Sequence, residues 1–284
     1  MKYVLRSIRH FLLAVQFFTR IPVTGRLAQW VGYSPAMLRA SAAHFPAIGV
    51  LVGALVVALS ALLLHGLPGI FAPLAAAALG TAWSIWITGA FHEDGLADVA
   101  DGLGGSYDRA RALTIMKDSR VGAFGAIAVV LALLAKVALL AVIGSVGAVW
   151  MCAAIMGGHV VSRTWPLLLI RLLPHVGDQD GSKSKPLADQ ITLPSLCVAL
   201  AWCAGALALT VWVQMALQPD ARIARAWCGG LLGSALAFWR AYALFARRLQ
   251  GFTGDCLGTT QQVCELAFYL GLALGLGLGA AAHA

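Results

Sequence analysis

The chain carries little charge for its length. Only 11% of its 284 residues are Asp, Glu, Lys or Arg, whereas 60% are hydrophobic. Soluble domains carry about 25% charged residues, so a water-soluble fold of this length could not cover so much apolar surface. The six cysteines contain no CxxC pair, which argues against a zinc site or a disulfide framework. No Lys/Arg run is interleaved with aromatic residues, so the net charge of +8 does not predict a nucleic-acid partner.

What the sequence does contain is a series of long apolar stretches. A membrane-spanning helix needs about 20 apolar residues, and seven stretches qualify. They cover residues 45–64, 70–91, 122–143, 148–170, 193–216, 226–246 and 264–282. We therefore expect an all-α fold, a polytopic transmembrane helix bundle in a lipid bilayer, with residues 1–284 forming a single integral membrane domain.

The N-terminal stretch has a different pattern. Lys2, Arg6 and Arg9 precede apolar residues that Gln16 and Arg20 interrupt, and no small-residue cleavage site follows closely. This pattern predicts a retained amphipathic helix that lies in the membrane interface rather than a signal peptide.

The basic residues predict the orientation of the bundle. Fifteen Lys and Arg residues fall in the loops on the side of the N-terminus, and the opposite loops hold only Arg222 and Arg225. Because loops rich in Lys and Arg stay in the cytoplasm, we expect a cytoplasmic N-terminus. Eleven of the twelve acidic residues lie on the same side, with Asp220 as the exception. Asp and Glu contribute little to orientation, so this asymmetry indicates a shared functional site.

The most informative acidic segment is residues 92–102. Asp94, Asp98 and Asp101 are spaced i, i+4 and i+7, which places them on one face of a helix that we expect to continue the second span into the cytoplasm. Like charges on one helical face repel, and a cation would relieve this repulsion. Mg²⁺ prefers oxygen ligands and commonly takes one or two carboxylates plus substrate phosphates. The alternative is a solvated acidic face, but such faces usually include Lys or Arg, and none occurs from 92 to 108.

Basic and hydroxyl side chains on the same side are candidate phosphate-binding groups, because Lys and Arg bind phosphate oxygens directly. The alternative is ordinary anchoring and orientation of the spans. The candidates are Lys117, Ser119, Arg120, Arg163, Lys183 and Lys185.

Two further carboxylates and one lysine need an interpretation. Asp255 stands where the last helix would begin, so it is either an N-cap or a catalytic group, and Glu265 could face the same cavity. Lys136 lies within a predicted span without an evident partner, which keeps a secondary transporter as an alternative. A purely structural subunit is a third interpretation, but it would not need three like charges on one helical face.

Four motifs carry a resemblance to a known family. They are Phe18 to Val23 (FTRIPV), His92 to Gly105 (HEDGLADVADGLGG), Ile115 to Gly125 (IMKDSRVGAFG) and Thr253 to Gly258 (TGDCLG). With these motifs the chain resembles the cobalamin synthase family, the adenosylcobinamide-GDP ribazoletransferases of the late cobalamin pathway. The resemblance extends over nearly the whole chain.

This resemblance implies a Mg²⁺-dependent enzyme of the bacterial cytoplasmic (inner) membrane, with its active site at the cytoplasmic face. Its substrates would be adenosylcobinamide-GDP and α-ribazole or the 5′-phosphate of α-ribazole, and GMP would leave. In this hypothesis the basic candidates named above bind the substrates, and either Asp118 or Asp255 removes the proton of the attacking hydroxyl. The expected metal ligands are Glu93, Asp94, Asp98 and Asp101. The oligomeric state stays open, a homo-oligomer included.

Overall fold

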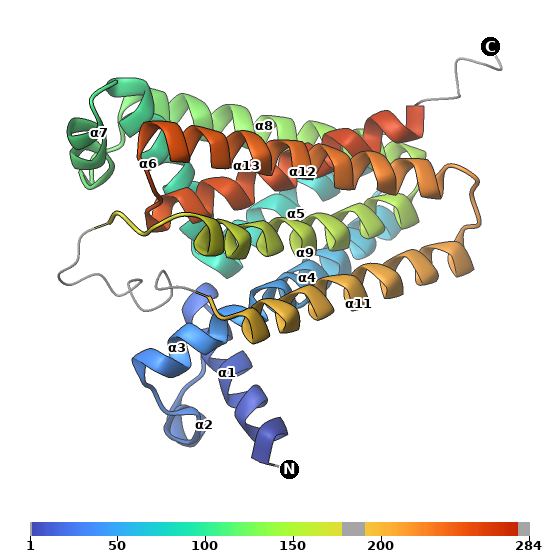
Figure 1. Ribbon diagram of the computed structural model, residues 1–284. Helices are drawn as coiled ribbons and strands as arrows, with labels where there is room; N and C mark the ends of the chain where they lie inside the picture. Colours follow the sequence, from blue (N-terminus) through green and yellow to red (C-terminus); the bar gives the residue numbers. More distant parts are fainter. Residues whose placement is uncertain (1, 178–190, 278–284) are drawn as a thin grey trace.

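The computed structural model describes residues 2–177 and 191–277. Within these ranges the chain consists of helices and turns, apart from one isolated bridge between His175 and Phe252. The long helices run side by side as a bundle (Figure 1). They are α4 (Phe45–Gly66), α5 (Ala72–Thr88), α8 (Ala123–Val146), α9 (Ala148–Leu172), α11 (Leu193–Leu217), α12 (Ile223–Arg248) and α13 (Gly254–Gly277). The predicted all-α bundle is confirmed.

The remaining helices gather at the end of the bundle where α4 begins and α5 ends (Figure 1). They are α1 (Lys2–Phe18), α2 (Gly25–Val31), α3 (Pro35–Ser41), the 3₁₀ helix η1 (Ala42–His44), α6 (Phe91–Gly105) and α7 (Arg109–Met116). The predicted N-terminal helix is α1, which buries Leu13 and Phe18 and exposes Leu5 and Ile8. This end of the bundle therefore brings together the basic N-terminal segment and the acidic segment.

The predicted count of seven spans is not confirmed. Among the described residues, five helices are long and apolar enough to cross a membrane, or six if the bent pair of α5 and α6 counts as one span. The helix not counted is α13, because its first half holds the polar run from Thr259 to Gln262 and the carboxylate of Glu265. These polar residues are buried, so α13 is an interior helix of the bundle.

Burial separates the centre of the bundle from its rim. In the apolar part of α9, 83% of the residues are buried, compared with 11% in α11. A helix that exposes apolar side chains on most of its surface suits a lipid environment, whereas a helix buried all round belongs to the core. The centre is therefore formed by α9 and α13, with α8, α11 and α12 at the periphery.

Close approach of α12 and α13 depends on glycine. A Cβ atom on Gly271 would collide with the carbonyl oxygen of Gly229, so the two backbones are in direct contact there. Small residues allow such contact between helices in lipid, where packing replaces the hydrophobic driving force. The glycine-rich last helix is thus held against its neighbour along its length.

The acidic segment does not continue the second span, and this prediction was wrong. The chain turns by 90° between α5 and α6. Gly89 and Ala90 both adopt the left-handed conformation, with φ of 71° and 60°, which an L-residue such as Ala90 adopts only at a cost of about 1–2 kcal/mol. Arg20 supports the bend, because its N–H donates to the carbonyl of Ile87 at 2.7 Å. As a result α6 lies across the end of the bundle instead of extending α5.

Candidate active site

The acidic helix α6 packs against the first turn of α13. Gly95 allows this contact, since a Cβ atom there would lie 2.8 Å from the carbonyl oxygen of Asp255. Asp94 is exposed, whereas Asp98 and Asp255 are half-buried. Burial, together with the negative charges of Asp255, Asp94 and Asp101, raises the pKa of Asp98 to about 7. Asp94, Asp98 and Asp255 thus form an acidic cluster whose repulsion a cation would relieve.

Asp101 has a different role from its two partners in the sequence pattern. Its carboxylate accepts hydrogen bonds from the backbone N–H groups of Gly122 at 2.7 Å and Gly125 at 2.8 Å. These N–H groups belong to the first turn of α8, where backbone donors have no partner within the helix. Asp101 is buried and caps α8 from a neighbouring helix. Although it was predicted as a metal ligand, its two oxygens are already engaged.

The arrangement of the acids bears on the metal. Within residues 2–177 and 191–277, no three His, Cys, Asp or Glu side chains are positioned to enclose a metal ion together. Mg²⁺ keeps several water molecules and usually takes one or two protein carboxylates plus substrate phosphates. Asp94 and Asp98, one turn apart on α6, provide such a pair of oxygen donors. The donor set therefore fits Mg²⁺ bound together with a phosphorylated substrate.

The basic candidates of the third motif lie in the loop between α7 and α8. Lys117, Ser119 and Arg120 are all exposed there. Arg120 pairs with Asp118, with Nη2 and Oδ2 separated by 2.6 Å. Hydrogen bonds from Arg120 lower the pKa of Asp118 to about 2, which makes this carboxylate a weak proton acceptor.

Two candidates cannot be placed. Lys183 and Lys185 lie outside the described residues.

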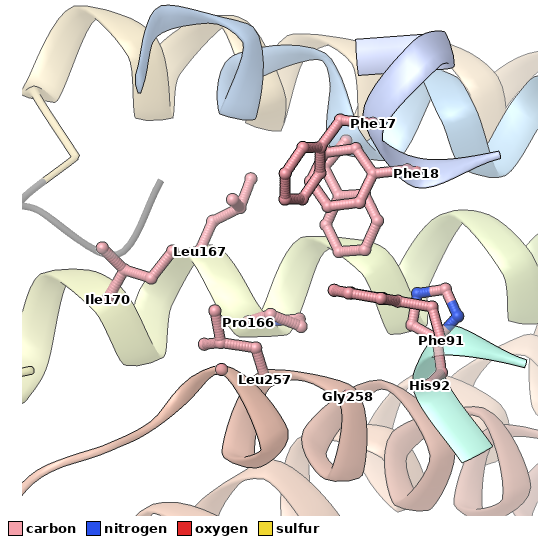
Figure 2. A pocket seen from close by; sticks show the side chains of 11 residues that line it. Phe17, Phe18, Phe91, His92, Pro166, Leu167, Ile170, Leu257 and Gly258 are labelled. Carbon is pink, nitrogen blue, oxygen red and sulfur yellow. The ribbon is translucent and has the colours of Figure 1, made fainter. Parts of the chain in front are cut away.

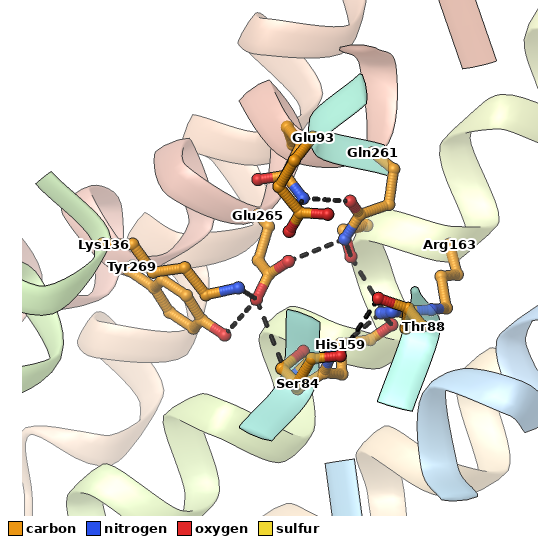
Figure 3. A network of polar contacts seen from close by, with 11 residues as sticks. Ser84, Thr88, Glu93, Lys136, His159, Arg163, Gln261, Glu265 and Tyr269 are labelled. Carbon is orange, nitrogen blue, oxygen red and sulfur yellow. Dashed lines mark hydrogen bonds and ion pairs between the residues drawn. The ribbon is translucent and has the colours of Figure 1, made fainter. Parts of the chain in front are cut away.

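A buried polar network in the bundle interior includes Glu93 of the acidic helix (Figure 3). Glu265 is at its centre and forms an ion pair of 2.8 Å with Lys136. Tyr269 donates to Glu265 at 2.7 Å, and the amide of Gln261 donates to it at 2.6 Å. Lys136, which had no evident partner in the sequence, is thus neutralised, and the observation that supported a transporter is removed.

The network extends from Glu265 to the acidic helix. The amide of Gln262 donates to Glu93 at 3.0 Å and to the side-chain oxygen of Gln261 at 2.9 Å. Glu93 is buried and faces the bundle interior rather than Asp94 and Asp98, although it was predicted as a further metal ligand. Its other carboxylate oxygen has no hydrogen-bond partner among the described residues.

Arg163 also belongs to this interior. Its side chain is 1% exposed, and its Nη1 lies 2.9 Å from Nδ1 of His159 and 3.0 Å from the carbonyl oxygen of the same residue. The guanidinium lies 5.9 Å from the centre of the Phe45 ring. The sequence predicted Arg163 as a substrate-binding residue. Its guanidinium is instead buried against His159, beneath the surface of the site.

An apolar pocket borders the acidic helix on another side (Figure 2). Its walls come from α1, α4, α6, α9 and α13, and include Phe18, Phe45, Phe91, His92 and Leu257. Its volume of about 40 Å³ holds a few water molecules. The pocket is therefore too small to hold a nucleoside or a larger ring system in this conformation.

Comparison with known proteins supports the motifs. The family model for cobalamin-5-phosphate synthase matches residues 10–273, which extends from α1 to the last turns of α13. The chain belongs to the cobalamin-5-phosphate synthase family. The predicted resemblance is confirmed.

Curated relatives agree along nearly the full length of the chain. A protein of Albidiferax ferrireducens named adenosylcobinamide-GDP ribazoletransferase is 66% identical, over 95% of this chain and 99% of its own. A protein of Polaromonas naphthalenivorans with the same name is 63% identical, over 96% of this chain and 100% of its own. One of Vibrio parahaemolyticus, again with this name, is 39% identical, over 92% and 91%. No solved structure matches the chain.

For this cobalamin-5-phosphate synthase family member, the structure brings together only part of the predicted site. Asp94, Asp98 and Asp255 meet at the contact between α6 and α13, with Lys117 and Arg120 exposed beyond the capped start of α8. Sequence reasoning missed the buried network as a unit, although the amides and hydroxyls of residues 259–262 and the unexplained Lys136 were its signals. The capping role of Asp101 left no signal, since it depends on a second helix.

Proposed function

We propose that this protein transfers the cobinamide phosphate of adenosylcobinamide-GDP to α-ribazole or its 5′-phosphate, which forms adenosylcobalamin or its phosphate and releases GMP. Membership of the cobalamin-5-phosphate synthase family and the shared name of relatives up to 66% identical support the reaction. The acidic cluster of Asp94, Asp98 and Asp255 is the observation that supports its location. We further propose a multi-pass protein of the bacterial inner membrane with its N-terminus and this cluster at the cytoplasmic face, as the basic loops predict.

The reaction is a displacement at phosphorus. A ribose hydroxyl oxygen of the acceptor forms a bond to the phosphorus nearest the cobinamide, and the bond from that phosphorus to the anhydride oxygen breaks. GMP leaves with the anhydride oxygen. Phosphoryl transfer depends mostly on positioning and on neutralising negative charge, so a site of fixed charges at a capped helix end suits it.

Each residue of the site then has a task. Asp255, half-buried beside α6, takes the proton of the acceptor hydroxyl, since Asp118 is held by Arg120 and is a weak base. Lys117 and Arg120 bind phosphate oxygens from the loop before α8. Asp94 and Asp98 would hold Mg²⁺, which when bound neutralises charge on the diphosphate and on the departing phosphate.

The experiment measures GMP release by the protein purified in detergent, with adenosylcobinamide-GDP, α-ribazole 5′-phosphate and Mg²⁺. We expect Asp94→Asn to reduce GMP release by about 100-fold, the effect typical of losing one group that stabilises a transition state. Asp108→Asn is the matched control. Asp108 caps α7 by accepting from the N–H of Arg111 at 2.8 Å, and Asn is an equally good cap. Equal activity of Asp94→Asn and Asp108→Asn would contradict a catalytic acidic cluster.

A further inference from the structure

A second cavity is lined by residues of α12 and α13. Its volume is about 470 Å³, within the range of roughly 300–1,000 Å³ that is usual for small-molecule sites. Most of its wall is apolar, with Ala237, Leu244 and Val263 among the lining residues. We call this cavity the α12–α13 groove. It is large enough for a nucleoside, unlike the apolar pocket beside His92.

Two arginines give the groove its charge. Arg240 and Arg247 both line it and are exposed. They are seven residues apart on α12, so both project from the same face of the helix. In the described parts of the chain neither guanidinium is paired with a carboxylate. The neighbouring Arg248 differs, because it donates to the carbonyl of Ser106 at 2.7 Å.

The groove is adjacent to the acidic cluster. Thr259 forms part of its wall, and its hydroxyl donates to the carbonyl of Gly95 on the acidic helix at 2.9 Å. Asp255 precedes Thr259 by four residues on α13. Side chains with this spacing are neighbours on a helix, with about 5–6 Å between their Cβ atoms. A ligand in the groove therefore lies within one helical turn of Asp255.

With the phosphorylated acceptor, the proposed reaction needs a binding site for a second anion. The description of the matching family, cobalamin-5-phosphate synthase, names a product that carries a 5-phosphate. One phosphate of the donor stays with the cobinamide and the other leaves in GMP, so this 5-phosphate has to enter with the acceptor. An acceptor nucleotide has an apolar aromatic base, a ribose and a dianionic phosphate. The groove offers an apolar wall and two guanidinium groups that have no carboxylate partner among the described residues, and guanidinium groups bind phosphate oxygens bidentately.

We propose that the α12–α13 groove binds the phosphorylated nucleoside acceptor, with its 5′-phosphate between Arg240 and Arg247 and its ribose directed toward Asp255. This inference rests on the proposed function and names the acceptor site within it. The groove is at the outer surface of the bundle, where phospholipids also reach it. The phosphate of an anionic phospholipid has the same chemistry as the phosphate of the acceptor. The experiment therefore has to separate these two sources of phosphate.

The experiment compares two acceptors, α-ribazole 5′-phosphate and unphosphorylated α-ribazole, in steady-state assays of GMP release. We expect Arg240→Gln and Arg247→Gln each to raise KM for the phosphorylated acceptor by about tenfold or more, as expected for the loss of a charged hydrogen bond. KM for α-ribazole should stay within about twofold of the wild-type value. Arg247→Lys keeps the charge without the bidentate geometry and should give an intermediate KM. Arg111→Gln, on the exposed face of α7, is the control and should change neither constant.

Several outcomes would overturn the proposal. An equal rise in KM for both acceptors, or no rise for either, would show that the groove does not bind the 5′-phosphate of the acceptor. The assays are repeated in vesicles of phosphatidylcholine with and without phosphatidylglycerol. If the Arg240→Gln defect appears only with phosphatidylglycerol, and for both acceptors, the groove binds lipid. If wild-type protein releases no GMP with either acceptor, the transferase function itself fails. Thermal unfolding of each variant identifies a loss that comes from misfolding.

Discussion

Lys136 on α8 and Glu265 on α13 form an ion pair of 2.8 Å, with only 3% and 1% of their side chains exposed. The pair joins a peripheral helix to the central one, at the core of the network that reaches the acidic helix through Gln261, Gln262 and Glu93. In a membrane protein an intramembrane charge usually marks a functional site. Here its role is to fix the position of the helix that carries Asp255.

The ion pair leads to a prediction about stability. Lys136→Met should destabilise the protein by about 3–5 kcal/mol, because Glu265 would remain as a buried charge without its main partner. Unfolding in mixed detergent measures the change. The double variant Lys136→Met/Glu265→Gln should recover part of the loss, since it removes the uncompensated charge. A double variant no more stable than Lys136→Met would show that the two side chains are not coupled.

The cap on α8 separates Asp101 from the proposed metal ligands. Asp101→Asn keeps one acceptor oxygen but replaces the other with an amide that cannot accept, so it should destabilise the protein by about 0.5–2 kcal/mol. Its affinity for Mn²⁺, measured by electron paramagnetic resonance, should match that of the wild-type protein. Asp94→Asn should instead weaken Mn²⁺ binding and leave stability nearly unchanged. Weak Mn²⁺ binding by a folded Asp101→Asn protein would restore Asp101 as a ligand.

The close contact of α6 and α8 can be tested at Gly125. A Cβ atom there would lie 2.8 Å from the carbonyl oxygen of Ala97 and would also collide with Asp101. We expect Gly125→Ala to cost about 1–3 kcal/mol and to reduce GMP release. Gly205 on α11 has open space around it, so Gly205→Ala should be neutral or stabilising by about 0.5–1 kcal/mol. Equal stability of the two variants would contradict the described packing.

The acidic cluster should be a source of instability when no metal is present. Asp98 has a pKa of about 7, so it is ionised at pH 8 and is repelled there by Asp94 and Asp255. Asp98→Asn should therefore raise the melting temperature in EDTA at pH 8 by a few degrees, which corresponds to about 1 kcal/mol in a large domain. Added Mg²⁺ should stabilise the wild-type protein and not the variant. A lower melting temperature of Asp98→Asn in EDTA would mean that the carboxylate is needed for the fold itself.

Apolar runs made most of the helices predictable. The predicted stretches 148–170 and 193–216 end within two residues of α9 and α11, because a continuous apolar run in lipid has helix as its ordinary solution. The turn before α6 was not predictable in the same way. Gly89 is a usual turn residue, but Ala90 takes a left-handed conformation that its identity does not favour. Tertiary contacts with Arg20 hold the turn, and such contacts leave no periodic signal.

The site was predictable to the extent that it lies on one helix. The i, i+4 spacing of Asp94 and Asp98 defined a shared face correctly. The spacing could not show that Asp101, the next member of the pattern, accepts from the backbone of α8. It also could not show that Asp255, from another helix, lies beside Asp98. In the same way the charge of Arg163 was evident, whereas its burial against His159 follows only from how α9 packs. Relations between helices are therefore what the structure adds.

The sharp bend between α5 and α6 has a consequence for how the bilayer acts on this protein. With 17 residues, α5 is about 25 Å long, shorter than a hydrocarbon core of about 30 Å. The chain cannot lengthen α5 to make up the difference, because it turns directly into α6. The depth of the carboxylates is thus set by the hydrophobic thickness around the protein, and lipid chain length becomes a variable that tunes how far the acids stand from the aqueous phase.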